Sequence, residues 1–293
     1  MSESPALTWR TQADFAAARV KAFFRQILNF LTGQRNDLLA YDQVREKLRI
    51  GGPIYRGVQT VPISQIIGSV DRYRDFDRAF LPRQDFMAER WQKVSRAWYQ
   101  DINLPPILLY KVGAVYFVVD GHHRVSVARE KGQAEIDAEV RECAVRVPVS
   151  PDLQPDDLEI LGAQVEFLER TGLDRVRPGA GLEVTILGGY DRMLEHIAVH
   201  RYFMGLEFQR DVPEDEAVGH WYDTVYLPIV SVIQEAEILK VFPGRTEADL
   251  YLWVLDHRHY LVERGQAGLV EPGQAAEEFL RAFFGQAPGA PAA

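Results

Sequence analysis

Five consecutive residues at 120–124, with the sequence Asp-Gly-His-His-Arg, have backbone and side-chain groups suited to binding a phosphate. They follow an apolar run at 114–119, which predicts a strand buried on both faces, and they precede a predicted helix that continues to residue 130. A strand that turns directly into a helix presents unpaired backbone N–H groups and the positive end of the helix dipole at one point. The sequence therefore predicts an anion site at this junction.

Each residue of this turn has its own chemistry. Gly121 allows a close backbone approach or a positive φ. His122 and His123 can donate hydrogen bonds, and Arg124 offers a planar fork to phosphate oxygens. Asp120 could orient Arg124, bind Mg²⁺ or accept a proton. In the alternative interpretation Asp120 only caps the helix, and the histidines and the arginine face solvent.

The elements that must position this turn come from residues 56–146. Short runs of alternating or β-branched residues predict strands, and apolar residues at three-and-four spacing predict helices. The predicted strands are 58–63, 106–110, 114–119 and 136–140, and the predicted helices are one starting at Gln65, one at 86–100 and one ending at Glu130. These elements predict an α+β domain.

The order of these elements resembles the ParB N-terminal/sulfiredoxin superfamily over roughly 90 residues. The matching motifs are Val-Pro-Ile-Ser-Gln-Ile at 61–66, Leu-Pro-Pro-Ile at 104–107 and Val-Val-Asp-Gly-His-His-Arg-Val-Ser-Val-Ala at 118–128. The turn is Gly-Glu-Arg-Arg in partitioning ParB proteins, Gly-Cys-His-Arg in sulfiredoxins and Asp-Gly-His-Thr-Arg in free-serine kinases, and this sequence is most similar to the last.

The resemblance implies a ParB/sulfiredoxin-like small mixed sheet with helices and a nucleotide, either ATP, ADP or CTP. It implies phosphate contacts from Gly121, His122, His123 and Arg124. Mg²⁺ would then bind near Asp120. Residue 122 is His where sulfiredoxins have their catalytic cysteine, which argues against repair of sulfinic acids. After residue 146 neither a helix-turn-helix pattern nor the Glu-Asn-x-x-Arg element of partitioning CTPases follows.

A polar loop at 71–78 carries a second set of candidate residues. In the serine-kinase relatives a catalytic carboxylate comes from this region, so the resemblance implies a base or metal ligand at Asp71 or Asp75. Arg72 or Arg74 would clamp a phosphate. A surface ladder of salt bridges explains the alternating charges equally well.

The net charge of −9 argues against a protein that coats nucleic acid, but the charge is unevenly distributed. Residues 1–150 hold 22 Lys and Arg against 17 Asp and Glu, a balance of +5; residues 151–293 hold 11 against 25, a balance of −14. This asymmetry predicts either weak nucleic-acid contact through the basic half or an interface between the two halves.

The remaining chain is predicted to form four further parts. Apolar spacing predicts a helical hairpin before the central domain and a mainly helical, acidic domain after it, while proline content predicts a linker. These parts are a hairpin at 1–55 with helices at 13–31 and 38–48, a linker at 147–157, a helical domain at 158–284 with one strand at 182–187, and a disordered tail at 285–293.

Other residues give weaker signals. Motifs such as His200-Arg201-Tyr202-Phe203 resemble an uncharacterised bacterial domain found beside ParB-like regions, which implies no activity. His196 and His200 stand four apart on a predicted helix and could share a metal, but no third ligand is evident, so packing is the preferred interpretation. Cys143 is the only cysteine, which excludes an internal disulfide, and we expect it to be a small buried apolar residue.

Together these patterns predict a cytoplasmic α+β protein without membrane contact that binds a nucleoside di- or triphosphate. Phosphoryl transfer or hydrolysis would use Asp120 with Asp71 or Asp75, and Mg²⁺. One alternative is a ParB-like, DNA-associated regulator or partition protein. Another is a non-catalytic sensor that passes the signal to the acidic domain. The expected partners are the nucleotide, nucleic acid held weakly, and further copies in a homo-oligomer.

Overall fold

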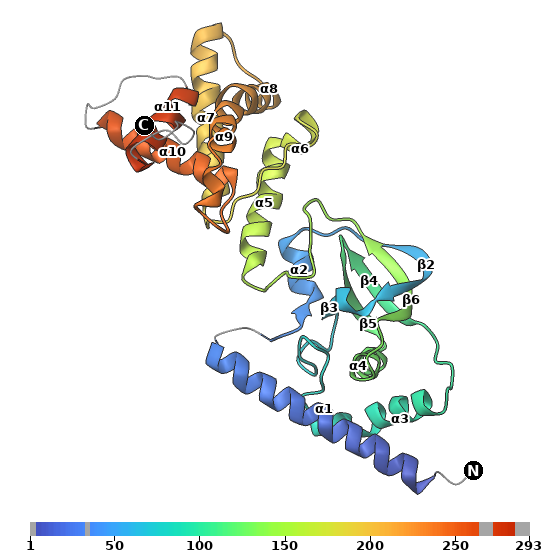
Figure 1. Cartoon of the computed structure of the whole chain (residues 1–293). Helices are drawn as coiled ribbons and strands as arrows, with labels where there is room; N and C mark the ends of the chain where they lie inside the picture. Colours follow the sequence, from blue (N-terminus) through green and yellow to red (C-terminus); the bar gives the residue numbers. More distant parts are fainter. Residues whose placement is uncertain (1–3, 33–35, 264–271, 285–293) are drawn as a thin grey trace. The chain divides into compact units, whose positions relative to one another are not determined.

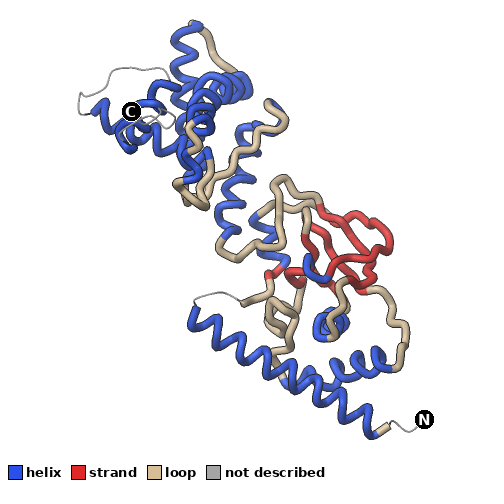
Figure 2. Tube along the Cα trace, in the orientation of Figure 1, coloured by secondary structure: helices blue, strands red, loops and turns tan. Residues whose placement is uncertain are grey.

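The structure is a computed structural model that describes residues 4–32, 36–263 and 272–284. The chain forms two compact units, Met1–Leu158 and Glu159–Ala293. Figure 1 labels the helices and strands, and Figure 2 distinguishes helices, strands and loops by colour. The tail predicted to be disordered, 285–293, lies outside the described residues.

The first unit is built on a six-stranded mixed sheet with the order β1-β3-β5-β4-β6-β2. β3 pairs in parallel with both β1 and β5, β4 pairs antiparallel with β5 and parallel with β6, and β2 pairs antiparallel with β6. The α+β class predicted from sequence is confirmed. The strands are β1 (Leu39–Ala40), β2 (Pro53–Pro62), β3 (Ile66–Ser69), β4 (Ile107–Val112), β5 (Val115–Asp120) and β6 (Glu135–Cys143).

Strand β5 lies between two neighbours and is buried on both faces, as its apolar sequence predicts. Val115, Phe117 and Val118 have no exposed surface. The strand ends at Asp120, and helix α4 begins two residues later at His122. The polar turn therefore directly follows a central strand of the sheet.

The described helices of this unit with α-helical geometry are α1 (Pro5–Thr32), α2 (Tyr41–Lys47), α3 (Ala88–Tyr99) and α4 (His122–Glu130). α3 packs on both α1 and α4, and the three helices lie together below the sheet in Figure 1. The Trp91 side chain of α3 is fully buried. Its ring lies 5.7 Å from that of Phe15 on α1, and its Nε1–H donates to Ser126 Oγ on α4 at 2.9 Å. One indole therefore fixes three helices.

The expected N-terminal helical hairpin differs from what the structure shows. α1 packs on α3, whereas α2 packs on β1, which pairs with β3 in the sheet. The buried residues Phe15, Ala18 and Ala22 of α1 face the first unit's core, and not a partner helix beside them in sequence. The apolar face of α1 can pack on any apolar surface of suitable shape, so its sequence alone does not specify its neighbour. The tertiary structure places it against α3 and the core of the first unit.

The predicted helix starting at Gln65 is wrong, because a 3₁₀ turn (Ile63–Gln65) leads into strand β3. All four residues of β3 are buried between β1 and β5. Gly68 makes this possible, since a Cβ atom there would lie 2.4 Å from the Phe117 ring and 2.6 Å from the Leu39 carbonyl oxygen. A strand of four residues, Ile-Ile-Gly-Ser, is too short for its sequence to distinguish the period of a strand from that of a helix.

Residues 147–157, expected to form a linker, pack on the first unit. Val147, Val149 and Leu153 are buried. The Nη2 atom of Arg78 donates hydrogen bonds to the carbonyl oxygens of Pro151, at 2.9 Å, and Leu153, at 2.7 Å. The prolines therefore mark an irregular segment that is anchored to the first unit.

The second unit contains helices and irregular segments in its described residues, as predicted from its apolar spacing. Its core includes the fully buried side chains of Trp221, Ile229 and Tyr251. None of the described helices is both long enough and apolar enough to cross a membrane. The helical segments are α5 (Asp157–Thr171), α6 (Leu173–Val176), α7 (Gly189–Phe208), α8 (Glu214–Trp221), a π-helical turn (Tyr222–Tyr226), α9 (Leu227–Glu235), a 3₁₀ turn (Ile238–Lys240), α10 (Glu247–Glu263) and α11 (Pro272–Phe284).

The strand predicted at 182–187 is wrong. The backbone N–H groups of Val184 and Thr185 donate to Tyr190 Oη at 3.2 Å and to Asp249 Oδ1 at 2.9 Å, so side chains take the place of a partner strand. Asp249 also forms a reciprocal cap with Thr246, because each backbone N–H donates to the other side chain at 3.2 Å. Asp249 therefore organises both the start of α10 and the segment beside it.

The close packing at Gly68 gives a stability prediction. Gly68→Ala should lower the free energy of unfolding by at least about 2 kcal/mol, because the new methyl group overlaps a ring and a backbone oxygen in a packed core. Urea denaturation followed by circular dichroism measures it. Gly52→Ala is the matched control, since a Cβ atom there would meet nothing within 4 Å. Equal stability of the two variants would contradict the packing of β3 against β5.

Candidate functional site

The turn between β5 and α4 depends on the backbone of Gly121. This residue is the N-cap of α4 and has φ 100° and ψ 18°, in the left-handed region that favours glycine. A Cβ atom there would lie 2.4 Å from Ile107 Cγ2 on β4. Glycine therefore allows a tight turn packed against β4, which places the first turn of α4 directly at the end of β5.

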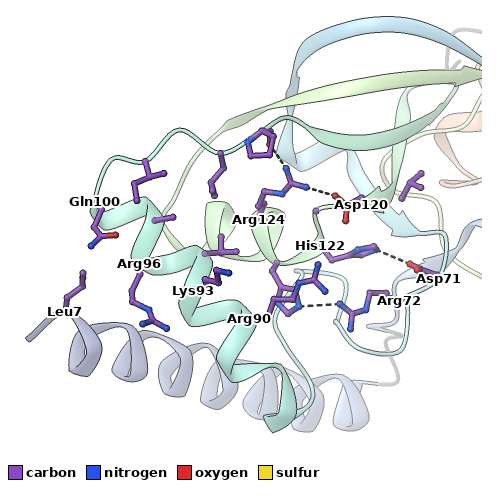
Figure 3. Close-up of a pocket in the computed structure, with 18 of the residues that line it drawn as sticks. Leu7, Asp71, Arg72, Arg90, Lys93, Arg96, Gln100, Asp120, His122 and Arg124 are labelled. Carbon is purple, nitrogen blue, oxygen red and sulfur yellow. Dashed lines mark hydrogen bonds and ion pairs between the residues drawn. The ribbon is translucent and has the colours of Figure 1, made fainter. Parts of the chain in front are cut away.

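A cavity of about 950 Å³ opens beside this turn. Its walls come from the start of α1, from α3, from the loop after β3 and from the turn itself (Figure 3). Five cationic side chains and two carboxylates line it, and all seven belong to the first unit. The cations are Arg72, Arg90, Lys93, Arg96 and Arg124, and the carboxylates are Asp71 and Asp120.

His122 is buried in the wall of this cavity, with 4% of its surface exposed. Its Nε2 lies 2.8 Å from Ser69 Oγ and 3.6 Å from Asp71 Oδ1. Ser69 Oγ accepts a hydrogen bond from the Arg72 backbone N–H at 2.9 Å, which leaves its own proton for Nε2. The end of β3 thus orients His122.

His123 is buried to a similar degree but is differently bonded. Its Nε2 lies 3.3 Å from Arg72 Nη1 and must accept that hydrogen bond, because a guanidinium can only donate. The ring proton of the neutral form is then on Nδ1, which is buried and has no partner among the described residues. This N–H is a buried donor that no described group accepts from.

The pKa values of His122 and His123 are both lowered to about 4, first by burial and then by the positive charge of Arg72. Both imidazoles are therefore neutral at neutral pH. They contribute hydrogen bonds, whereas the positive charge of the cavity comes from its arginines and lysine.

Arg124 is held by its own chain. Its Nη2 donates to Asp120 Oδ2 at 2.6 Å, and its Nη1 donates to the carbonyl oxygens of Pro105 and, at 3.0 Å, Pro106. Arg124 thus fixes the segment before β4, and Asp120 orients Arg124, which is one of the roles predicted for that carboxylate. Nε and one Nη2 proton are left for a ligand.

The structure brings together seven of the nine candidate residues in the cavity lining: Asp71, Arg72, Asp120, Gly121, His122, His123 and Arg124. Arg74 and Asp75 do not line it. Asp75 pairs with Arg72 Nε at 3.0 Å, and the Arg74 guanidinium lies over the Tyr73 ring. Among the described residues no group of three or more His, Cys, Asp or Glu could hold a metal ion.

The cationic face of α3 was not identified from sequence. Arg90, Lys93 and Arg96 are spaced by three residues, so they lie near one another on the helix surface. Arg90 and Lys93 are exposed and make no ion pair with a described residue. The sequence contained a signal for this face, namely three basic residues at a spacing of three. The helix was interpreted only from its aromatic and apolar residues, which predict its buried side.

In the second unit His196 and His200, for which packing was preferred over a shared metal, contact side chains of other helices. His196 Nδ1 lies 3.1 Å from Tyr251 Oη, and His200 Nε2 lies 2.8 Å from His220 Nδ1. The two histidines therefore form hydrogen bonds with different neighbours.

In the first unit Cys143 is buried, as expected, and its Sγ lies 3.3 Å from Tyr41 Oη.

Comparison with protein-family models gives no match, and comparison with curated proteins gives none either.

The buried histidines predict an acid-sensitive fold. The unfolded chain has histidine pKa values near 6.5, so between pH 6.5 and 4 it binds protons that the folded chain does not. The free energy of unfolding is highest above pH 6.5 and should fall by about 2 kcal/mol per histidine at pH 5.

Urea denaturation of the wild type and of His123→Gln at pH 7.5 and 5.0 measures this effect. The variant should lose less stability on acidification, because glutamine does not titrate. The same loss in both proteins would show that His123 is not buried in its neutral form.

Proposed function

We propose that the first unit binds a nucleoside di- or triphosphate, with the phosphate chain in the cavity beside the β5–α4 turn. The observation that carries this proposal is the charge of the cavity: five cations and two carboxylates, one of which is paired with Arg124. Arg72 pairs with Asp75, whereas Arg90 and Lys93 make no ion pair with a described residue. A polyanion gains from these two exposed cations, and the first turn of α4 adds backbone N–H groups and a favourable dipole.

The shape of the cationic surface favours a phosphate chain over a single phosphate. Arg90 and Arg96 stand six residues apart on α3 with Lys93 between them, a rise of about 9 Å at 1.5 Å per residue. Arg72 and the α4 turn extend the surface on the other side of the cavity (Figure 3). Two or three linked phosphates could contact both sides at once.

The rest of the cavity has the size and lining for a nucleoside. Small-molecule sites commonly enclose 300–1,000 Å³, and the cavity of about 950 Å³ lies within that range. Val94, Ile102 and Leu104 contribute apolar surface beside Gln100. A base can pack on such surface while an amide reads its polar edge. The resemblance to the ParB/sulfiredoxin superfamily supports ATP, ADP or CTP as the ligand.

Phosphoryl transfer or hydrolysis is the catalytic form of this proposal. Asp71 and Asp120 both line the cavity and flank His122, whereas Asp75 does not line it. Two carboxylates are fewer than a protein-only metal site needs, but Mg²⁺ often binds through one or two carboxylates plus substrate phosphates. The non-catalytic alternative is a nucleotide sensor that uses the same cavity.

Nucleotide binding should follow the charges of α3. With Mg²⁺, ATP, ADP or CTP should raise the melting temperature, and AMP should do so far less. Arg90→Ala and Lys93→Ala should each weaken binding about tenfold or more, because each removes a charge-assisted contact. Isothermal titration calorimetry measures the affinities.

Arg74→Ala is the matched control, since it removes an exposed arginine of the same unit that does not line the cavity. Its affinity should equal that of the wild type. Equal losses in Arg74→Ala and Arg90→Ala would locate the phosphates outside the cavity.

Single-turnover release of phosphate or diphosphate separates an enzyme from a sensor. If the protein is an enzyme, Asp120→Asn and Asp71→Asn should each slow release by about 100-fold or more while affinity changes much less, because bases and metal ligands act mainly on the transition state. Asp75→Asn is the control and should keep the wild-type rate. If no phosphate or diphosphate is released above the uncatalysed rate, even with small hydroxylated acceptors present, the catalytic form is wrong and the protein is a nucleotide sensor.

A further inference from the structure

Helix α1 has two apolar faces, and only one of them is covered. Thr11, Phe15, Ala18 and Ala22 are buried in the first unit. On the opposite side of the helix, six apolar side chains occupy an arc of about 140° at 100° per residue. They are exposed by 42–74% and comprise Val20, Phe23, Phe24, Ile27, Leu28 and Leu31. Scattered exposed apolar residues are normal, but a continuous arc over three turns indicates an interaction surface.

The polar residues beside this arc are cationic or neutral. No acidic residue occurs between Phe15 and Thr32. Lys21 pairs with Glu130 of α4, whereas Arg25 makes no ion pair with a described residue. Pairing of two α1 helices would bring like charges together, so the charge of this face favours an acidic partner.

Helix α7 in the second unit has a face with the complementary properties. Val199, Tyr202, Phe203 and Leu206 are exposed by 56–64% and share one side of the helix, about 100° wide. The buried residues of α7, which include Met193, Ile197 and Met204, lie on the other side.

Acidic residues border this second face. Asp191, Glu195 and Glu207 are exposed on the same helix and form no ion pair with a described residue. The apolar residues of this face, from Val199 to Leu206, span about 11 Å, so they can lie within the arc of α1 from Val20 to Leu31, which spans about 17 Å. The two faces therefore share apolar character and differ in charge.

We propose that this chain forms a two-fold symmetric dimer in which the α1 face of each copy, Val20 to Leu31, packs on the α7 face of the other. A second copy explains both exposed faces at once, and the reciprocal arrangement closes without forming a filament. The balance of +5 in residues 1–150 and −14 in residues 151–293 favours the same pairing of unlike halves.

Sedimentation equilibrium or light scattering tests the dimer on the full chain. The expected mass of the wild type at micromolar concentration is twice 33.4 kDa. Phe24→Glu on α1 and Phe203→Glu on α7 should each give a monomer, because a carboxylate would be buried in the interface. Both side chains are more than 60% exposed, so the variants should keep the wild-type circular dichroism.

Two further variants make the test specific. Arg25→Glu, which changes only an exposed charge, should weaken dimerisation about tenfold, and Val58→Glu, at an exposed residue of β2, should leave it unchanged. An equimolar mixture of Phe24→Glu and Phe203→Glu should associate, since one copy still has an intact α1 face and the other an intact α7 face.

Three results would overturn the proposal. A monomeric wild type would show that no second copy covers these faces. A dimer that survives Phe203→Glu but not Phe24→Glu would mean that α1 pairs with itself. A monomer that binds phosphatidylserine vesicles, and loses that binding in Phe24→Glu, would assign the α1 face to an anionic membrane surface.

Discussion

The backbone at Gly121 is the constraint on which the site depends. Its left-handed conformation, and its contact with Ile107 where a side chain would not fit, let β5 pass into α4 without a connecting loop. Asp120 and His122 therefore stand on either side of one residue, at the end of a strand that is buried on both faces. A longer connection would have placed these side chains on a surface loop, where their positions would be less fixed.

Charge and hydrogen bonding are divided between different elements of the cavity. The histidines of α4 are buried and neutral, and Ser69 and Arg72 from the end of β3 fix their ring nitrogens. Arg90 and Lys93 on α3 supply charge that no described carboxylate neutralises. An anion entering this cavity would meet neutral imidazoles and the first turn of α4 on one side and exposed cations on the other. Such a division suits a ligand with several negative charges, because the buried groups need not be ionised.

The second unit uses buried polar groups for a different purpose. Asp249 accepts hydrogen bonds from the backbone of Thr185 and Thr246, and Tyr251 Oη contacts both Trp221 and His196. These bonds satisfy backbone N–H groups beside α10 and ring nitrogens of α7 and α8 that would otherwise be unpaired in the core. The outer face of α7, in contrast, has apolar side chains without such partners. This difference separates the residues that stabilise the unit from those that suit an interface.

The sequence alone determined the elements whose signals are local. The apolar stretch at 114–119, the turn at 120–124, the helix containing Trp91 and the reciprocal cap of Thr246 and Asp249 all follow from residue type and spacing. These features depend on neighbours within about four residues, which a sequence displays directly. The composition of the β5–α4 turn was sufficient to propose an anion site there.

Only the tertiary structure decided which distant segments meet. β3 is a strand because β1 and β5 lie on either side of it, and 182–187 is irregular because Tyr190 and Asp249 take its N–H groups. The cations of α3 belong to the cavity because Trp91 holds that helix against α4, whereas Asp75, which pairs with Arg72, does not line it. Such outcomes depend on which distant segments bury one another. The local sequence pattern of a segment is compatible with several such arrangements and does not select one of them.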